Sequence, residues 1–193
     1  DPKLIGGMIV GNLTASADSW GGGILCRDSS PGLIGIQIGL NQSGDGGGVA
    51  ITDNSSPLIF GCLIGKNVAV DGGLTGRGGG ISIQDCAGMP VIFYSVIAQN
   101  LAHFSGGGIH CNFPGTALIA RCSVYDNLSA VGGGIDVELD QAPVIWQTLV
   151  ASNQAVSFGG GINTDFGAAP LIAGCWIIDN KAAGPPDPVP DKY

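Results

Sequence analysis

The stretch GGGISIQDCAGMPVIFYSVIAQN, residues 78–100, contains the pattern that decides the fold. It begins with three glycines, carries a proline at position 90 and ends on Asn100. Between these residues lie three short apolar segments, each with a β-branched residue at its centre or ends, as is typical of strands. The stretch therefore predicts three short strands separated by corners.

The same pattern recurs along the chain. Glycine triplets followed by Ile or Val begin at positions 21, 46, 78, 106, 132 and 159, at intervals of 25 to 32 residues. A proline stands ten residues before an asparagine in every repeat except one, where Ala117 takes the proline position. The asparagines are Asn12, Asn41, Asn67, Asn100, Asn127, Asn153 and Asn180. A period of this length predicts a solenoid, and the frequent glycines argue against helical repeats.

Apolar residues occupy fixed columns of the repeat, which indicates an all-β parallel β-helix with three strands per coil and about six to seven coils. Two residues after the proline position the residue is always Leu or Ile, as in Ile59 and Ile92. We expect the solenoid to span residues 1–184 and a proline-rich, extended tail to occupy residues 185–193. Glycine and asparagine supply left-handed backbone at the corners, and we expect the asparagine amides to form a hydrogen-bonded ladder along the rod.

These motifs resemble those of a known group of proteins. The Gly-Gly-Gly-Ile triplets and the Ile-x-x-Asn endings, as in Ile64 to Asn67, resemble the repeats of secreted bacterial right-handed β-helix proteins. They are similar to the Gly-Gly-Ala-Ile and Phe-x-x-Asn repeats of chlamydial polymorphic outer-membrane proteins, and pectate-lyase-like folds share the architecture more distantly. The resemblance implies a right-handed solenoid in a secreted, extracellular or cell-surface setting. It specifies no activity, because the motifs belong to the scaffold.

Composition excludes several classes of partner. The net charge is −8 and only seven residues are Lys or Arg, so we expect no nucleic-acid partner. No run of 18 apolar residues is present, so we expect no membrane-spanning segment. The six cysteines form no C-x-x-C pair and no cluster with histidine, which predicts free, buried thiols and no zinc site built from cysteine.

Strand alternation predicts that two of the three faces carry apolar side chains on the outside. Contiguous exposed apolar patches usually mark interfaces, so we expect a homo-oligomer or filament that forms through these faces and through open coil ends. The expected assembly face consists of Leu58, Phe60, Val91, Phe93, Val144, Trp146, Leu63, Leu149 and Trp176.

The third, glycine-led face is polar, and we expect most of it to be solvated. The candidates for chemistry on it are His110, Asp136, Glu138 and Asp165, which fall in two outward columns. Glu138 and Asp165 are also candidates for a Ca²⁺ site, because paired carboxylates offer hard oxygen ligands. A polysaccharide lyase would need a basic residue beside a carboxylate, and none lies closer in sequence than Arg121.

We therefore expect a structural subunit of an extracellular or cell-surface assembly, a head-to-tail filament or a surface layer, and not an enzyme with a cofactor. The alternative is a carbohydrate-binding or polysaccharide-degrading β-helix whose site lies around His110, Asp136, Glu138 and Asp165. In that case glycans would be the partner. Depolymerisation of an acidic glycan would distinguish the second hypothesis from the first.

Overall fold

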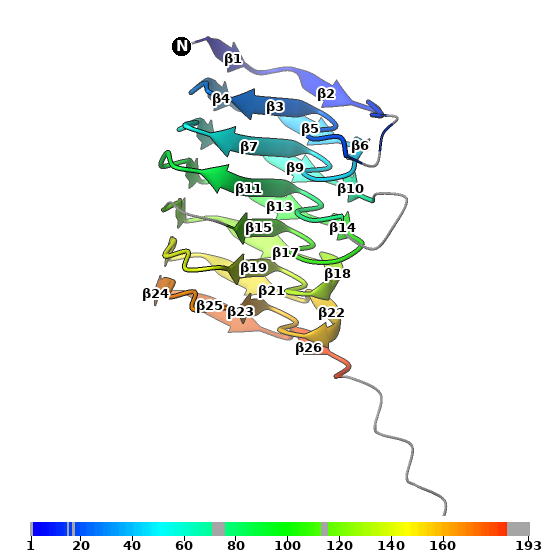
Figure 1. Ribbon diagram of the computed structural model, residues 1–193, viewed down its shortest axis with the longest axis vertical. Coiled ribbons are helices and arrows are strands. Elements are labelled where there is room, and N and C mark those ends of the chain that lie inside the picture. The colour runs from blue at the N-terminus through cyan, green and yellow to red at the C-terminus, as the bar shows by residue number, and fades with distance from the viewer. Residues whose placement is uncertain (1, 15, 17, 71–75, 113–115, 185–193) are drawn as a thin grey trace, which may run out of the picture.

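The computed structural model confirms an all-β parallel β-solenoid of about six turns. It describes residues 2–14, 16, 18–70, 76–112 and 116–184, so the tail predicted for 185–193 lies outside the described residues. The coils stack one on the next from the N-terminal end (Figure 1). The described part of the chain contains no helix with the length and apolarity that a membrane span requires.

Each coil contributes strands to four parallel sheets, which we name by their place in the repeat. The proline sheet contains β1 (Lys3–Ile5), β4 (Gly32–Ile34), β8 (Leu58–Phe60), β12 (Val91–Phe93), β16 (Leu118–Ala120), β20 (Val144–Trp146) and β24 (Leu171–Ala173). The second sheet contains β2 (Met8–Val10), β5 (Gln37–Gly39), β9 (Leu63–Gly65), β13 (Val96–Ala98), β17 (Ser123–Tyr125), β21 (Leu149–Ala151) and β25 (Trp176–Ile178).

The other two sheets follow in each coil. The short sheet contains β6 (Gln42–Ser43), β10 (Val68–Ala69), β14 (Leu101–Ala102), β18 (Leu128–Val131), β22 (Gln154–Phe158) and β26 (Lys181–Ala182). The glycine sheet contains β3 (Ile24–Arg27), β7 (Val49–Asp53), β11 (Ile81–Cys86), β15 (Ile109–Asn112), β19 (Ile135–Glu138) and β23 (Ile162–Thr164). The short sheet adds a fourth strand to the three per coil that the sequence predicts. Several of its strands are only two residues long, which is too short for the sequence pattern to indicate them.

The apolar columns pair in the predicted register. Ile92 pairs with Ile59 on one side and with Ile119 on the other, and equivalent pairs run along the whole proline sheet. The inward residues of the middle coils are fully buried and form one continuous hydrophobic core. The six cysteines are free, and all of them except the half-buried Cys175 lie in this core.

Single residues with left-handed backbone turn the chain between sheets. The corner after the proline sheet has positive φ whether it is glycine, as in Gly61 (62°), or a larger residue such as Tyr94 (50°). The corner after the second sheet has positive φ on the residue before each asparagine, for example Gln99 (58°) before Asn100. The expectation that the asparagines themselves adopt this conformation is therefore wrong.

The asparagine side chains form a ladder inside the coil. Asn67 donates from its backbone N–H and from Nδ2 to Oδ1 of Asn100, each over 3.0 Å, and Asn100 donates to Asn127 in the same way. Nδ2 of Asn100 also donates to the backbone carbonyl of Ile64, over 3.0 Å. Each middle rung thus satisfies buried backbone groups at a corner that no strand pairing reaches.

The glycine triplet makes a turn that lies directly on the strand that follows it. Gly106 has φ +62°, and a Cβ on it would lie 2.7 Å from Cβ of His110, four residues later. A Cβ on Gly108 would lie 2.6 Å from the backbone oxygen of Gly134 in the next coil. The triplet is needed because the turn packs against its own strand and against neighbouring coils with no room for a side chain.

Candidate functional site

A buried polar cluster lies on the outward side of the glycine sheet. Nδ1 of His110, on β15, is 3.1 Å from Oδ2 of Asp136, which occupies the paired position on β19. Glu138, two residues further along β19, hydrogen-bonds to Asp136. One nitrogen or oxygen atom from each of these three side chains lies within 4.8 Å of the others, and all three residues are buried.

The glycine turn causes this burial. The outward side chains of the glycine sheet lie beneath the triplet of their own coil, since a Cβ on Gly132 would lie 2.6 Å from Cβ of Asp136. Ser105, which precedes the triplet of its coil, places Oγ 3.1 Å from Nδ1 of His110. His110 and Asp136 are both 0% exposed as a result. The expectation of a solvated polar face is therefore wrong for the middle coils.

The electrostatics of the cluster place a proton on Glu138. Burial, the charge of Asp136 and a hydrogen bond to Asp136 together raise the pKa of Glu138 to about 7. Burial also opposes ionisation of Asp136, but hydrogen bonding and charge from His110, with a hydrogen bond from Asn163, hold the pKa of Asp136 below its ordinary value. The two carboxyl groups thus form a pair in which Asp136 is ionised and Glu138 holds a proton below about pH 7.

A pocket of about 560 Å³ connects this cluster to the surface. Its lining includes Glu138 and the exposed Asp165, together with Phe104, Phe158 and Phe166. Asp165 accepts a hydrogen bond of 2.7 Å from the backbone N–H of Phe166 and is not part of the three-residue cluster. The structure therefore groups Glu138 with His110 and Asp136, whereas the Ca²⁺ hypothesis paired Glu138 with Asp165.

Three further residues complete this site: Asn163, which the sequence places in the column of His110 and Asp136 without a role, and Ser105 and Arg77, which sequence reasoning missed. Asn163 donates from Nδ2 to Oδ1 of Asp136 over 2.8 Å and so fixes that carboxylate. Ser105 and Arg77 come from the segments that precede glycine triplets, and Arg77 lies on the pocket wall with its guanidinium carbon 5.4 Å from the centroid of the Phe104 ring. The alignment of Asn163 with Asp136 was visible in the columns, but the contribution of the segments before the triplets was not.

The proline sheet presents the apolar stripe that alternation predicts. Phe60 and Trp146 are 40% and 38% exposed, and Val91, Phe93 and Val144 are half-buried. The rings of Phe60, Phe93 and Tyr94 form one cluster, with centroids 6.1 Å apart for Phe60 and Phe93, 4.4 Å for Phe93 and Tyr94, and 6.0 Å for Phe60 and Tyr94. From β4 to β24 no outward residue of this sheet carries a charge. The stripe is therefore a continuous apolar surface of packed side chains.

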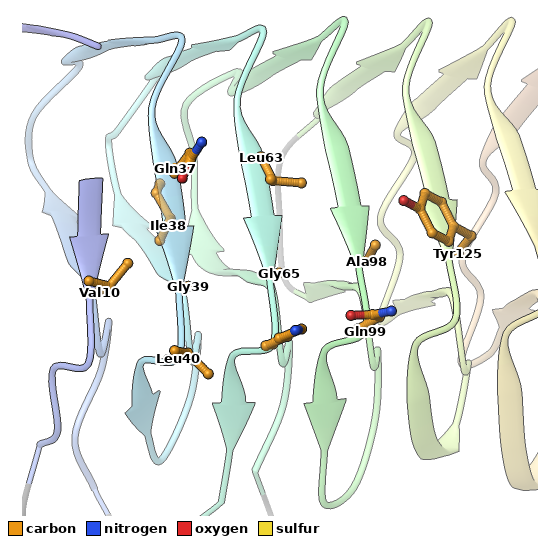
Figure 2. Close-up of a pocket in the computed structure, with 11 residues that line it drawn as sticks. Val10, Gln37, Ile38, Gly39, Leu40, Leu63, Gly65, Ala98, Gln99 and Tyr125 are labelled. Atoms are coloured by element: carbon orange, nitrogen blue, oxygen red, sulfur yellow. The ribbon is translucent and has the colours of Figure 1, made fainter. Parts of the chain in front are cut away.

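The second sheet has a more broken surface. Its first outward column contains the exposed Leu63 and Trp176 and the half-buried Leu149, but Gln37 and Ser123 interrupt it. In the next outward column small residues create a groove of about 360 Å³. Figure 2 shows Gly39, Gly65 and Ala98 in a row between Val10 and Tyr125. The predicted apolar face is thus continuous on the proline sheet and interrupted on the second sheet.

The short sheet carries a further apolar groove that the sequence did not predict. The groove has a volume of about 370 Å³, and Leu101, Leu128 and Val156 on its walls are exposed. It was missed because two-residue strands leave too little alternation to assign an outward face. We use this surface below as a control for the proline sheet.

Comparison with known protein families, with curated proteins and with solved structures gives no match to this chain, so the assignment of function depends on the geometry described above.

Proposed function

We propose that the chain is a non-enzymatic structural subunit whose solenoid associates side by side with further copies through the outer face of the proline sheet. The observation that carries the proposal is the uncharged apolar stripe over β4 to β24, in a chain whose net charge is −8. The outward strand residues bring no charge to this interface, but the guanidinium carbon of Arg121, at a corner beside the stripe, lies 5.2 Å from the centroid of the Trp146 ring. Because burial of an unpaired charge is costly, a second copy has to leave Arg121 at the edge of the contact or stack on its guanidinium. The proposed setting is extracellular or at a cell surface, by resemblance to secreted bacterial β-helix repeats.

The shape of the stripe supports association between rods. Parallel pairing holds Leu58, Val91 and Val144 in one outward column, with Phe60, Phe93 and Trp146 in the column beside it. Neighbouring strands are about 4.8 Å apart, and Leu118 continues the first column between Val91 and Val144, so that column forms a ridge along the rod. In the second column the buried Ala120 separates Phe93 from Trp146. Exposed apolar surface of this extent, with aromatic residues at its centre, is typical of protein interfaces.

The test is the oligomeric state of the purified chain. We expect concentration-dependent association in sedimentation velocity, and we expect Phe60→Asp and Phe93→Asp each to raise the apparent dissociation constant roughly 30-fold or more, as for central interface residues. Leu101→Asp on the short sheet is the matched control, because Leu101 is 41% exposed and Phe60 is 40% exposed. Wild-type protein that stays monomeric at high concentration, or association that responds to Leu101→Asp and not to Phe60→Asp, would contradict the proposal.

A second candidate function is carbohydrate binding at the pocket beside Glu138. Three phenylalanine rings and the polar groups of Asp165, Asn163 and Thr164 line this pocket, and aromatic faces with hydrogen-bonding groups suit sugar rings. The raised pKa of Glu138, about 7, leaves a substantial fraction of this carboxyl group protonated near neutral pH, as a general acid in glycoside cleavage requires. Release of reducing ends from a glycan by wild-type protein, and its loss in Glu138→Gln, would favour this candidate over the structural one.

A further inference from the structure

The described structure contains one cluster of three potential metal ligands, and it lies under the glycine turn. We propose that His110, Asp136 and Glu138 bind one divalent first-row transition-metal ion, with Zn²⁺ as the representative ion. The proposal is independent of side-by-side association, because the cluster and the proline sheet lie on different faces of the coil.

The distances within the cluster suit a single ion. Ligands that bind Zn²⁺ at about 2.0–2.2 Å are separated from one another by roughly 3 to 3.5 Å. Nδ1 of His110 and Oδ2 of Asp136 already lie 3.1 Å apart. One ligand atom from each of the three side chains lies within 4.8 Å of the other two, so a contraction of roughly 1 to 2 Å would complete a three-ligand set.

The protein alone leaves polar atoms of this region without partners. Nε2 of His110, in a side chain that is 0% exposed, has no hydrogen-bond partner among the described residues. Oδ1 of Asn112 is also buried without a partner, and Asn112 pairs with Glu138 across neighbouring strands. Buried polar atoms are normally paired. An ion in the cluster would reach only one ring nitrogen of His110, because Nδ1 and Nε2 point in different directions from the ring, and it would add positive charge beside two carboxyl groups that are otherwise buried side by side.

The types of ligand indicate the class of metal. Imidazole nitrogen with two carboxylates suits Zn²⁺, Mn²⁺ or Fe²⁺, whereas Ca²⁺ takes six to eight oxygen ligands and Mg²⁺ retains most of its waters. Arg77 is the cation that faces this region, and its charge acts on Glu138. Its guanidinium lies over the Phe104 ring, and the described residues show no ion pair between it and either carboxylate.

Outer contacts and access also fit a metal site. Nδ2 of Asn163 donates a hydrogen bond of 2.8 Å to Oδ1 of Asp136, in the way that outer hydrogen bonds orient metal-binding carboxylates. Oγ of Ser105 lies 3.1 Å from Nδ1 of His110 and adds a neutral oxygen beside the same position. The pocket that reaches Glu138 gives an ion a path from solvent.

The experiment uses the full chain, stripped with EDTA and exchanged into buffer with ZnCl₂ alone. We expect one Zn²⁺ per chain to remain after gel filtration, measured by elemental analysis, and a rise in the melting temperature with added Zn²⁺. Glu138→Gln and Asp136→Asn should each weaken Zn²⁺ binding, measured by competition with a chelating dye, by at least about 10- to 100-fold. Asp165→Asn, in the same pocket but outside the cluster, should bind within threefold of wild type.

The control variant separates this site from its alternatives. Circular dichroism in EDTA identifies a variant that does not fold. If Asp136→Asn does not fold, Glu138→Gln decides the result, because Glu138 lies at the edge of the cluster and is 8% exposed. Binding that survives Glu138→Gln overturns the proposal and points to an adventitious surface ion. Equal loss in Asp165→Asn and Glu138→Gln also overturns it, in favour of a carboxylate site in the open pocket, and so does the absence of stoichiometric Zn²⁺ in folded wild-type protein.

Discussion

The proline sheet and the glycine sheet reverse the usual relation between polarity and exposure. Outward side chains of the proline sheet are apolar and partly exposed, as at Phe60 and Trp146. Outward side chains of the glycine sheet are polar, yet His110 and Asp136 are fully buried. Both sheets alternate inward and outward residues in the same way, so alternation alone does not decide which outward residues meet water.

The difference lies in the segment that enters each strand. Segments such as 54–57 and 87–90, each ending in a proline, lead into the proline sheet, and most outward side chains of that sheet stay partly exposed. Three glycines lead into the glycine sheet, and the first of them lies against the side chain four residues later, as Gly106 does against His110. A turn without side chains can therefore cover a strand that no other layer covers, and the polar groups beneath it must hydrogen-bond to one another.

The largest effect should come from a side chain placed in the glycine turn. Gly106→Ala is expected to cost more than about 4 kcal/mol of unfolding free energy or to prevent folding, because left-handed strain and overpacking act together. Gly61→Ala is the matched control, since Gly61 has the same φ of +62° and no atom within 4 Å of its Cβ position. We expect it to lose only about 1–2 kcal/mol. Equal losses in urea denaturation would contradict the role of the turn as a cover.

The next largest effect should follow from removal of the central carboxylate of the buried cluster. Asp136→Ala removes the acceptor of Nδ2 of Asn163 and leaves Nδ1 of His110 with only Oγ of Ser105 as a partner, so it is expected to cost about 3 kcal/mol. Asp165→Ala, at an exposed position, should change the unfolding free energy by less than about 0.5 kcal/mol. Urea denaturation in EDTA measures the unfolding free energy of both variants. A similarly small loss of unfolding free energy in Asp136→Ala and Asp165→Ala would show that the cluster does not contribute to stability.

The smallest effect concerns pH. The pKa of Glu138 in the folded chain is about 7, above its ordinary value of 4.5, so the folded protein holds a proton that the unfolded chain has released. Stability in EDTA should therefore fall as pH rises from about 4.5 to 7, and the loss should be complete above that window. Glu138→Gln should remove this decline in the melting temperature, whereas Asp165→Asn should retain it. A wild-type melting temperature that rises through the window would contradict the burial of a protonated Glu138.

Much of the fold could be predicted from the sequence because its determinants repeat. Every coil places Leu or Ile at the centre of its proline-sheet strand, as at Ile59 and Ile92, and parallel stacking converts that repetition into register. The asparagine column was equally clear, because one polar residue recurred ten positions after each proline. The left-handed backbone of the corner was assigned to the asparagine, but it belongs to the residue before it, Gln99 and not Asn100.

The candidate site could be predicted only in part. The pairing of His110 with Asp136 and of Asn112 with Glu138 follows from the columns. Ser105 and Arg77 could not be placed, because the segments before the triplets vary in length from coil to coil and follow no fixed spacing. The short sheet was missed for a related reason, since strands of two residues such as Val68–Ala69 contain no measurable alternation.

The sequence by itself determined the solenoid, its register and the identity of the side chains in each column, because these depend on local periodicity repeated seven times along the proline sheet. Only the tertiary structure decided which outward side chains are covered. That outcome depends on how closely a glycine turn approaches the strand after it and the coils beside it, a contact between backbone atoms that leaves no mark on the polarity pattern. The glycine turn removes His110 and Asp136 from water, and strand pairing places them side by side.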